Sequence, residues 1–408
     1  MVASILVARM LGKVGMGELG IIQNTVGIFS AFAGLGMGLT ATKFVAEYRV
    51  ADPVRAGAML GLSAWVTWLS GALMMGAMLV FAPWFAESTL AAPHLTALIR
   101  IGSALLLLGS VNGAQTGALA GFEAFKTIAR VSLISGLLNF PLMVGGAWWL
   151  GLEGAVWGFV AAQAVGCLFS HLALRREAAS AGVPLCAKLQ PGQWDVLWRF
   201  SLPSVLCNAI YGPVNWACAA LLVNRSNGYA EMGVFNVTMT WFNVVAFLPG
   251  VLGQVILPLL SARNGEEGCR DQKRIVWLAV KTNAIVVIPI ALILALSSPL
   301  IMSFYGSGFR DGWPTLVLTV FTAVVIAIHG PPAQSLIAGG HMWAFFAMHL
   351  GWGLAALGGT VALVSFGSFG LAGARLAAYV LSSTAVIWFA ARYCFAPQRI
   401  SPARSNIR

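Results

Sequence analysis

Long uncharged stretches alternate with short polar connections along the whole chain. In the first half, four such stretches of 22 to 31 residues each lie between two charged residues, and a fifth apolar run follows. A transmembrane helix needs about 20 apolar residues to cross the hydrocarbon core, so each stretch predicts one membrane span. The stretches are residues 19–42, 56–86, 101–122, 131–152 and 154–174.

The second half repeats this rhythm after a polar linker, residues 175–195. The spans predicted beyond it are 200–224, 232–262 and 282–309, then two within the 63 uncharged residues 312–374, broken near Gly339-Gly340-His341, and a last one ending near Arg392. The first 11 residues are apolar but too few to cross a membrane. They also lack the charged start and cleavage site of a signal peptide. We expect them to be the end of a first helix whose beginning is missing.

Composition agrees with this pattern. Of the 408 residues, 59% are hydrophobic and only 9% are charged, against about 25% in soluble domains, and the mean hydropathy is +0.84. So few charges do not cover a water-facing surface, which excludes a soluble enzyme. The predicted fold class is an all-α polytopic membrane protein of about 12 transmembrane helices, the first of them truncated.

The distribution of lysine and arginine predicts the orientation in the membrane. With the opening segment counted as helix one, 18 of these residues lie on one side of the membrane and five on the other. Because basic residues accumulate in cytoplasmic loops, we expect the central linker and the C-terminus to be cytoplasmic. The net charge of +11 is spread singly between apolar runs. Without a basic stripe, it predicts no nucleic-acid partner.

The two halves resemble each other at a nearly constant offset. Glu18-Leu19-Gly20 matches Glu231-Met232-Gly233 at 213 residues, and Gly151 and Gly154 match Gly367 and Gly370 at 216. The offset spans six helices, an even number, so both halves enter the membrane from the same side. Parallel repeats of this kind are typical of transporters that bind substrate between two lobes. The predicted parts are an N-terminal lobe (1–174), a linker (175–197), a C-terminal lobe (198–395) and a tail (396–408).

The segment from Ala8 to Tyr48 carries a family signature. Its elements are A-R-x-L-G (residues 8–12), G-E-L-G (17–20), G-L-G-M-G (34–38) and T-K-F-V-A-E-Y (42–48). In these elements the chain resembles the polysaccharide and O-antigen flippases of the multidrug/oligosaccharidyl-lipid/polysaccharide exporter superfamily. Elsewhere the resemblance rests on the twelve-helix hydropathy, the repeat and the linker.

The resemblance implies a MATE-like, V-shaped pair of six-helix bundles in the bacterial inner membrane. It implies that helices one, two, seven and eight line a central cavity. The implied substrate is a polyprenyl-diphosphate-linked glycan, and no cofactor is expected. The implied partners are membrane lipids, a polysaccharide polymerase and a chain-length regulator.

A cavity for a sugar diphosphate needs cations and hydrogen-bonding groups. Arginine binds diphosphate in a bidentate manner, and a basic group at mid-bilayer costs about 2.5–3.5 kcal/mol. The candidate phosphate-binding residues are Arg9, Arg225, Lys43 and Arg375, the last placed one turn inside the final span. Arg9 and Arg225, at corresponding ends of helices one and seven, are expected to face each other across the cavity mouth. The alternative is that they extend to the membrane interface as snorkelling residues.

Amide side chains cluster on the helices expected to line the cavity. The candidate sugar-binding residues are Gln23, Asn24, Asn208, Asn215, Asn236 and Asn243. Within two of the pairs, Asn208 with Asn215 and Asn236 with Asn243, the residues are seven apart and share a helix face. The alternative for this set is hydrogen bonding between helices.

Other chemistry is not favoured. Residues 15–20 spell G-x-G-x-x-G but follow an apolar helix rather than a strand, so a dinucleotide site is not expected. The histidines and cysteines lack metal-ligand spacing, and no metal is expected.

The favoured function is a flippase, a transporter and not an enzyme. The spans hold no carboxylate well inside their apolar runs, whereas a transporter coupled to a cation or proton is expected to have one. We therefore expect the membrane potential, without ATP, to drive the movement of the anionic substrate. The alternatives are a multidrug cation antiporter of the same fold, an O-antigen polymerase or ligase, and a peptidoglycan-precursor flippase.

Overall fold

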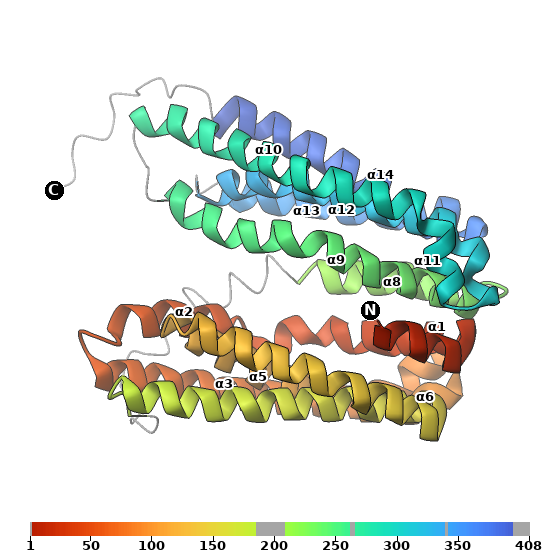
Figure 1. Ribbon diagram of the computed structural model, residues 1–408, viewed down its shortest axis with the longest axis horizontal. Helices are drawn as coiled ribbons and strands as arrows, with labels where there is room; N and C mark the ends of the chain where they lie inside the picture. Colours follow the sequence, from red (N-terminus) through yellow and green to blue (C-terminus); the bar gives the residue numbers. More distant parts are fainter. Residues whose placement is uncertain (1, 185–208, 262–265, 339–341, 395–408) are drawn as a thin grey trace. The chain divides into compact units, whose positions relative to one another are not determined.

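The computed structural model describes residues 2–184, 209–261, 266–338 and 342–394. Nearly all of these residues are helical (Figure 1), so the predicted all-α class is confirmed. The chain divides into two compact units, Met1–Asn236 and Val237–Arg408. The first unit therefore extends past the predicted linker, most of which lies outside the described residues.

The first unit is a bundle of long helices. In it α5 packs against α2, α3 and α6, and α1 packs against α3, α6 and α8. A π-helical turn, Phe85–Thr89, continues α3. The helices are α1 (Val2–Gly34), α2 (Met37–Tyr48), α3 (Pro53–Trp84), α4 (Thr96–Gly102), α5 (Ala104–Gly121), α6 (Phe125–Ser180), α8 (Tyr211–Val223) and the beginning of α9 (Gly228–Ser261).

Glycines break the first-unit helices where the backbone turns. Gly12 in α1 and Gly151 in α6 have φ of 68° and 60°, a left-handed conformation that residues with a Cβ rarely adopt. Gly12 separates the short opening helix from the predicted second span, and Gly151 separates the predicted spans 131–152 and 154–174. Within the predicted span 19–42, Leu35 and Gly36 (φ 41° and 65°) separate α1 from α2.

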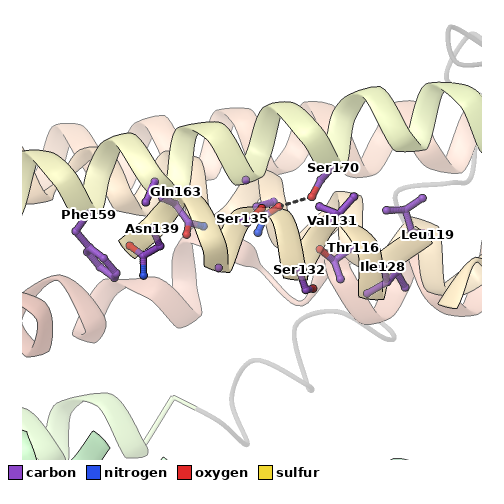
Figure 2. A pocket seen from close by; sticks show the side chains of 14 residues that line it. Thr116, Leu119, Ile128, Val131, Ser132, Ser135, Asn139, Phe159, Gln163 and Ser170 are labelled. Carbon is purple, nitrogen blue, oxygen red and sulfur yellow. Dashed lines mark hydrogen bonds between the residues drawn. The ribbon is translucent and has the colours of Figure 1, made fainter. Parts of the chain in front are cut away.

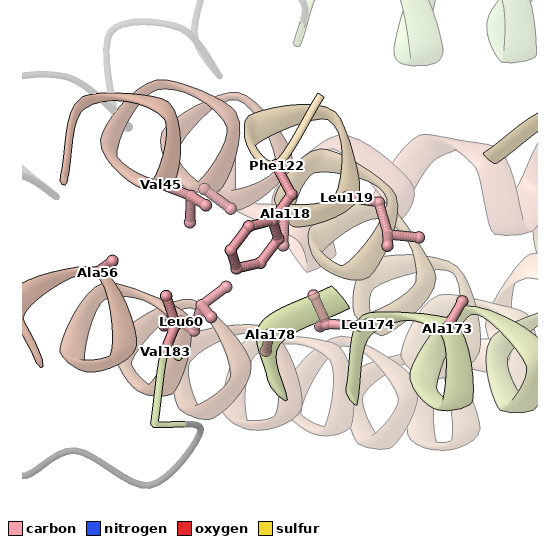
Figure 3. Packing of buried hydrophobic residues seen from close by; sticks show 11 residues of the cluster. Val45, Ala56, Leu60, Ala118, Leu119, Phe122, Ala173, Leu174, Ala178 and Val183 are labelled. Atoms are coloured by element: carbon pink, nitrogen blue, oxygen red, sulfur yellow. The ribbon is translucent and has the colours of Figure 1, made fainter. Parts of the chain in front are cut away.

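Small residues bring α2 and α5 into backbone contact. A Cβ at Gly117 would lie 2.1 Å from the carbonyl oxygen of Gly38, and the Thr42 hydroxyl donates to the Gly117 carbonyl over 2.8 Å. Small side chains permit such close approach in membrane helices, where lipid leaves no hydrophobic driving force between them. Figure 3 shows the buried cluster beside this contact, in which Phe122 inserts among residues of α2, α3, α5 and the end of α6.

An ion pair lies at the C-terminal end of α2. The Arg49 guanidinium lies 2.8 Å from a Glu123 carboxylate oxygen and donates to the Phe122 carbonyl over 2.6 Å. Glu123 itself has a φ of 58° and lies two residues after the end of α5. The pair therefore ties the connection after α2 to the connection after α5.

The second unit is also helical. In it α14 packs against α12 and α13, and α10 packs against α12. Its helices are the remainder of α9, α10 (Glu266–Leu296), α11 (Ser298–Phe304), α12 (Trp313–Ala338), α13 (Met342–Leu363) and α14 (Gly367–Phe389). The break predicted near Gly339-Gly340-His341 lies outside the described residues, between α12 and α13.

The internal repeat is visible in the backbone. Gly151 and Gly367, which match across the repeat, have φ/ψ of 60°/−131° and 63°/−139°. Three residues later, a Cβ at Gly154 would lie 1.9 Å from the Gly146 carbonyl oxygen, and a Cβ at Gly370 would lie 1.8 Å from that of Leu363. Both halves thus make the same glycine turn, followed by the same close approach to the preceding helix.

Six helical stretches of the described residues are long and apolar enough to cross a membrane. Two of them, 125–180 and 343–392, are 56 and 50 residues long and are interrupted at Gly151 and at residues 364–366, so each holds two of the predicted spans. A polytopic membrane protein is therefore confirmed.

Candidate functional site

Arg375 is a predicted cation that the structure places well inside a span. It follows the first residue of α14 by eight positions, more than two turns at 3.6 residues per turn. The prediction of one turn is wrong because α14 already begins at Gly367, within an uncharged run that offers no charge to mark a boundary.

The surroundings of Arg375 are apolar and aromatic. One terminal nitrogen of its guanidinium lies 3.5 Å from the Met239 sulfur, and its centre lies 5.3 Å from the Phe242 ring and 5.9 Å from the Tyr379 ring. The Nε atom is buried and has no hydrogen-bond partner. Among the residues that the structure describes, no carboxylate pairs with this cation. The guanidinium is therefore held by soft contacts, with hydrogen-bonding capacity left over.

The other three predicted cations are exposed. Arg9 lies in α1 just before the Gly12 break, and Lys43 lies in α2 with its ammonium 5.1 Å from the Phe44 ring. Arg225 lies in the turn between α8 and α9, where its carbonyl accepts from the Gly228 amide. Exposed positions fit both the interfacial role and the cavity-mouth role, so the cavity-mouth role stays a prediction.

The predicted sugar-binding amides take up different positions. Asn24 and Asn215 donate to the carbonyls of Gly20 and Tyr211, four residues earlier in their own helices, over 3.0 and 2.8 Å. Gln23 is half-buried in α1, and Asn243 is exposed in the part of α9 that belongs to the second unit. Asn208 lies outside the described residues.

Asn236 bridges two helices. Its side-chain amide donates to the Met16 carbonyl of α1 over 3.2 Å, and the carbon of that amide would lie 2.8 Å from a Cβ at Gly20. This is the geometry of the alternative considered above for the amide set, hydrogen bonding between helices.

Glycines let the backbones of α1 and α9 approach closely along residues 13–20 and 229–236, a contact called here the seam between α1 and α9. A Cβ at Gly17 would lie 1.8 Å from the Tyr229 carbonyl oxygen, and a Cβ at Gly233 would lie 1.9 Å from that of Lys13. The matched segments 18–20 and 231–233 therefore lie in helices that pack backbone to backbone. The G-x-G-x-x-G letters of residues 15–20 lie within a helix and serve this contact, so they form no phosphate-binding turn.

Polar contacts attach α8 and the start of α9 to the rest of the first unit. The Trp216 indole N–H donates to the Thr25 hydroxyl over 3.2 Å, and the Asn224 amide donates to the Thr89 carbonyl over 2.7 Å. The Tyr229 hydroxyl donates to the Leu90 carbonyl over 2.8 Å. Two causes raise the pKa of Tyr229 to about 12: burial, which is the larger, and the negative charge of the nearby Glu18 carboxylate. The phenol therefore keeps its proton and remains a donor.

Histidine, cysteine and carboxylate side chains form no three-residue cluster suited to a metal ion within the described part of the chain. Glu18 instead lies 2.7 Å from His94, a hydrogen-bonded pair near the seam.

Sequence reasoning missed a set of neutral polar residues on α6. Ser132, Ser135 and Asn139 recur at intervals of three and four residues, and Gln163 and Ser170 are seven apart. Both spacings place the side chains on one helix face. That periodicity was the available signal, but isolated serines are common in membrane helices and carry little information alone.

Comparison with known proteins identifies the family. The family model described as "Polysaccharide biosynthesis protein" matches residues 1–263. The EPS I polysaccharide export inner membrane protein EpsE of Ralstonia nicotianae is 21% identical over 260 residues, which cover 61% of this chain and 57% of that protein. The match thus spans little more than half of this relative.

Solved structures show the same fold. An inward-facing multidrug resistance MATE family transporter of the MOP superfamily has a TM-score of 0.75 at 15% identity, covering 96% of this chain and 93% of that one. A MOP superfamily transporter from Pyrococcus furiosus, described by the reverse polarity of its binding pocket, has a TM-score of 0.68 at 16% identity, with 96% and 90% covered. The resemblance seen in residues 8–48 is confirmed. The chain belongs to the polysaccharide biosynthesis protein family and has the MATE-like fold of the multidrug/oligosaccharidyl-lipid/polysaccharide exporters.

Proposed function

We propose that the chain is a flippase of the bacterial inner membrane. It moves a polyprenyl-diphosphate-linked oligosaccharide from the cytoplasmic to the periplasmic leaflet by alternating access of two lobes. Membership of a polysaccharide biosynthesis family supports the glycan substrate. The fold shared with transporters supports movement of a substrate rather than its chemical conversion.

Arg375 is the observation that carries the substrate assignment. A lone basic residue inside a span is costly, and such residues mark substrate or ion pathways. Its guanidinium has a buried N–H without a partner and no carboxylate beside it among the described residues. A diphosphate supplies both the missing charge and the acceptor oxygens, and arginine binds phosphate through two parallel hydrogen bonds.

The same observation argues against export of a cationic drug. A positively charged group within the span repels a cation and attracts an anion. A polyprenyl diphosphate is anionic at its headgroup, whereas a cation exporter needs buried carboxylates on its path. The Pyrococcus furiosus transporter, described as having a binding pocket of reverse polarity that suggests a different function, supports the view that this fold accommodates either charge.

The remaining predicted residues have auxiliary roles in this proposal. Arg9, Lys43 and Arg225 are exposed, and there they attract the anionic headgroup as it enters or leaves. The candidate sugar contacts are the predicted amides Gln23, Asn24, Asn215 and Asn243. The proposed protein partners are a polysaccharide polymerase and a chain-length regulator, which act on the glycan after it has crossed.

The test is transport of a fluorescent polyprenyl-diphosphate glycan by purified protein in liposomes. Arg375→Leu should lower the initial rate at least tenfold, and Arg375→Lys should restore part of it because the charge returns without the bidentate geometry. Arg392→Leu is the matched control, since Arg392 is exposed in the π-helical turn that directly follows the same helix, 5.4 Å from the Trp388 ring.

Thermal unfolding separates transport from folding. Removing an uncompensated charge from a span should leave the melting temperature of Arg375→Leu equal to or above that of the wild type. A wild type that does not move the lipid contradicts the flippase. An Arg375→Leu variant with the wild-type rate contradicts the phosphate-binding role.

A further inference from the structure

A polar cavity lies inside the first unit, between α5 and the two segments of α6 on either side of Gly151. Figure 2 shows its lining side chains, among them Ser135, Asn139 and Gln163. Its volume is ≈ 230 Å³. A water molecule takes about 30 Å³ in the liquid, so the cavity has room for roughly seven waters or for one small polar molecule.

The polar face of α6 is separate from its apolar face. Ser132, Ser135 and Asn139 line the cavity, whereas the neighbouring Leu133 and Leu137 are 63% and 66% exposed and face away from the protein interior. In an α-helix, a shift of one residue turns the side chain by about 100°. Ser135 and Asn139 are therefore half-buried on the cavity side of the helix, whereas Ser132 lies at an exposed edge of the cavity.

Two polar atoms in this cavity lack partners. Ser135 Oγ and Asn139 Oδ1 are buried without a hydrogen bond, whereas the Ser170 hydroxyl donates to Asn112 Oδ1 over 2.8 Å (Figure 2). A buried polar group without a partner costs about 1–3 kcal/mol, so a ligand that bonds to these atoms gains that energy. The side chains are thus ready to bind a ligand that both donates and accepts hydrogen bonds.

The lining selects the class of ligand. None of the described residues that line the cavity is charged, so neither an anion nor a cation finds a counter-charge there. Hydroxyls and amides both donate and accept, as sugar hydroxyls do. Phe159 and Val131 add apolar surface for the C–H face of a ring. A few placed polar groups within an otherwise apolar wall are typical of small-molecule sites.

We infer that this cavity binds one neutral sugar residue of the transported glycan, while the diphosphate is bound elsewhere. The inference rests on the proposed function for the source of the sugar.

The test fills the cavity without disturbing the helix. A Cβ at Gly136, which lines the cavity, meets no atom within 4 Å, so Gly136→Leu places its side chain in free space. Gly145→Leu is the matched control, because Gly145 lies on the same helix, also meets no atom within 4 Å and does not line the cavity. Both changes raise helix propensity equally.

Binding is measured by native mass spectrometry in phosphatidylcholine nanodiscs, whose headgroup carries no free polyol. Polyprenyl diphosphate bearing one neutral hexose competes there with the sugar-free lipid. The wild type and Gly145→Leu should prefer the hexose lipid about tenfold. Gly136→Leu should bind the two lipids equally, with unchanged affinity for the sugar-free one.

Asn139→Leu supplies a second readout. It removes a buried acceptor that has no partner, so the preference for the hexose lipid should fall while the melting temperature stays equal or rises. A fall in melting temperature with an unchanged preference would show a structural role and overturn the inference.

The outcomes separate the two proposals. A Gly136→Leu variant that keeps the tenfold preference overturns the sugar site alone. A wild type that binds both lipids without preference shows a cavity that holds water only, which also overturns it. A wild type that binds neither lipid contradicts the flippase itself.

Discussion

The seam between α1 and α9 offers the sharpest test of the packing. Gly17→Ala adds one methyl group that would lie 1.8 Å from the Tyr229 carbonyl oxygen and 2.8 Å from its carbon. Real Cβ atoms keep at least 3.0 Å from such atoms, so the two backbones must separate by about 1.2 Å. That separation also lengthens the hydrogen bond from Asn236 to the Met16 carbonyl, 3.2 Å in the structure.

The cost follows from overpacking. Inserting a methyl group into a filled interface typically costs about 1–3 kcal/mol. For a unit of this size, each kcal/mol lowers the melting temperature by about 2–4 °C, so a fall of roughly 2–12 °C is expected. Gly27→Ala is the matched control on the same helix, because its Cβ meets no atom within 4 Å and the change should slightly stabilise the helix.

Thermal unfolding of the purified variants in one detergent measures the difference. Gly233→Ala should behave like Gly17→Ala, since its Cβ would lie 1.9 Å from the Lys13 carbonyl oxygen on the opposite side of the seam. The reasoning is refuted if Gly17→Ala melts at or above the temperature of Gly27→Ala.

Three further predictions concern the repeat, the energy source and the orientation. Gly367→Ala should lower the unfolding free energy by about 1–2 kcal/mol, because the φ of 63° at this position disfavours a residue with a Cβ. Gly358→Ala is the control and should not lower it, because a Cβ at Gly358 meets open space. Equal melting temperatures of the two variants would count against a strained turn at Gly367. Flipping in liposomes should accelerate when the destination side is positive, because two charges moving through 100 mV release roughly 4.6 kcal/mol, and a rate indifferent to the sign of a clamped potential would exclude this drive. In a variant whose other five cysteines are replaced by serine, the native Cys186 of the central linker, residues 175–197, should react with a membrane-impermeant maleimide only after cells are opened, and labelling of intact spheroplasts would reverse the predicted topology.

Some features of the site were readable in the sequence because they depend on residue type alone. A charge within an apolar run stands out wherever the helix begins, so Arg375 was identified although its depth was not. Amides were visible too, but their partners were not. Asn24 and Asn215 bond to their own helices, and Asn236 reaches the Met16 carbonyl 220 residues away.

The roles of the glycines show the same division. Gly34, Gly36 and Gly38 belong to one glycine-rich element of the family signature. Gly38 packs closely against Gly117, whereas Gly36 precedes α2 with a left-handed φ. Nothing in the letters distinguishes the two roles, because each is decided by which backbone lies nearby.

The sequence by itself determined that this chain is a helical membrane protein with two similar halves. Hydrocarbon excludes charge and unpaired backbone over about 20 residues at a time, and that constraint is written locally in every span. Only the tertiary structure decided which glycines lie against another backbone and which polar atoms lack a partner. Those properties depend on residues distant along the chain, as when Gly17 meets Tyr229 or α5 and α6 enclose Asn139.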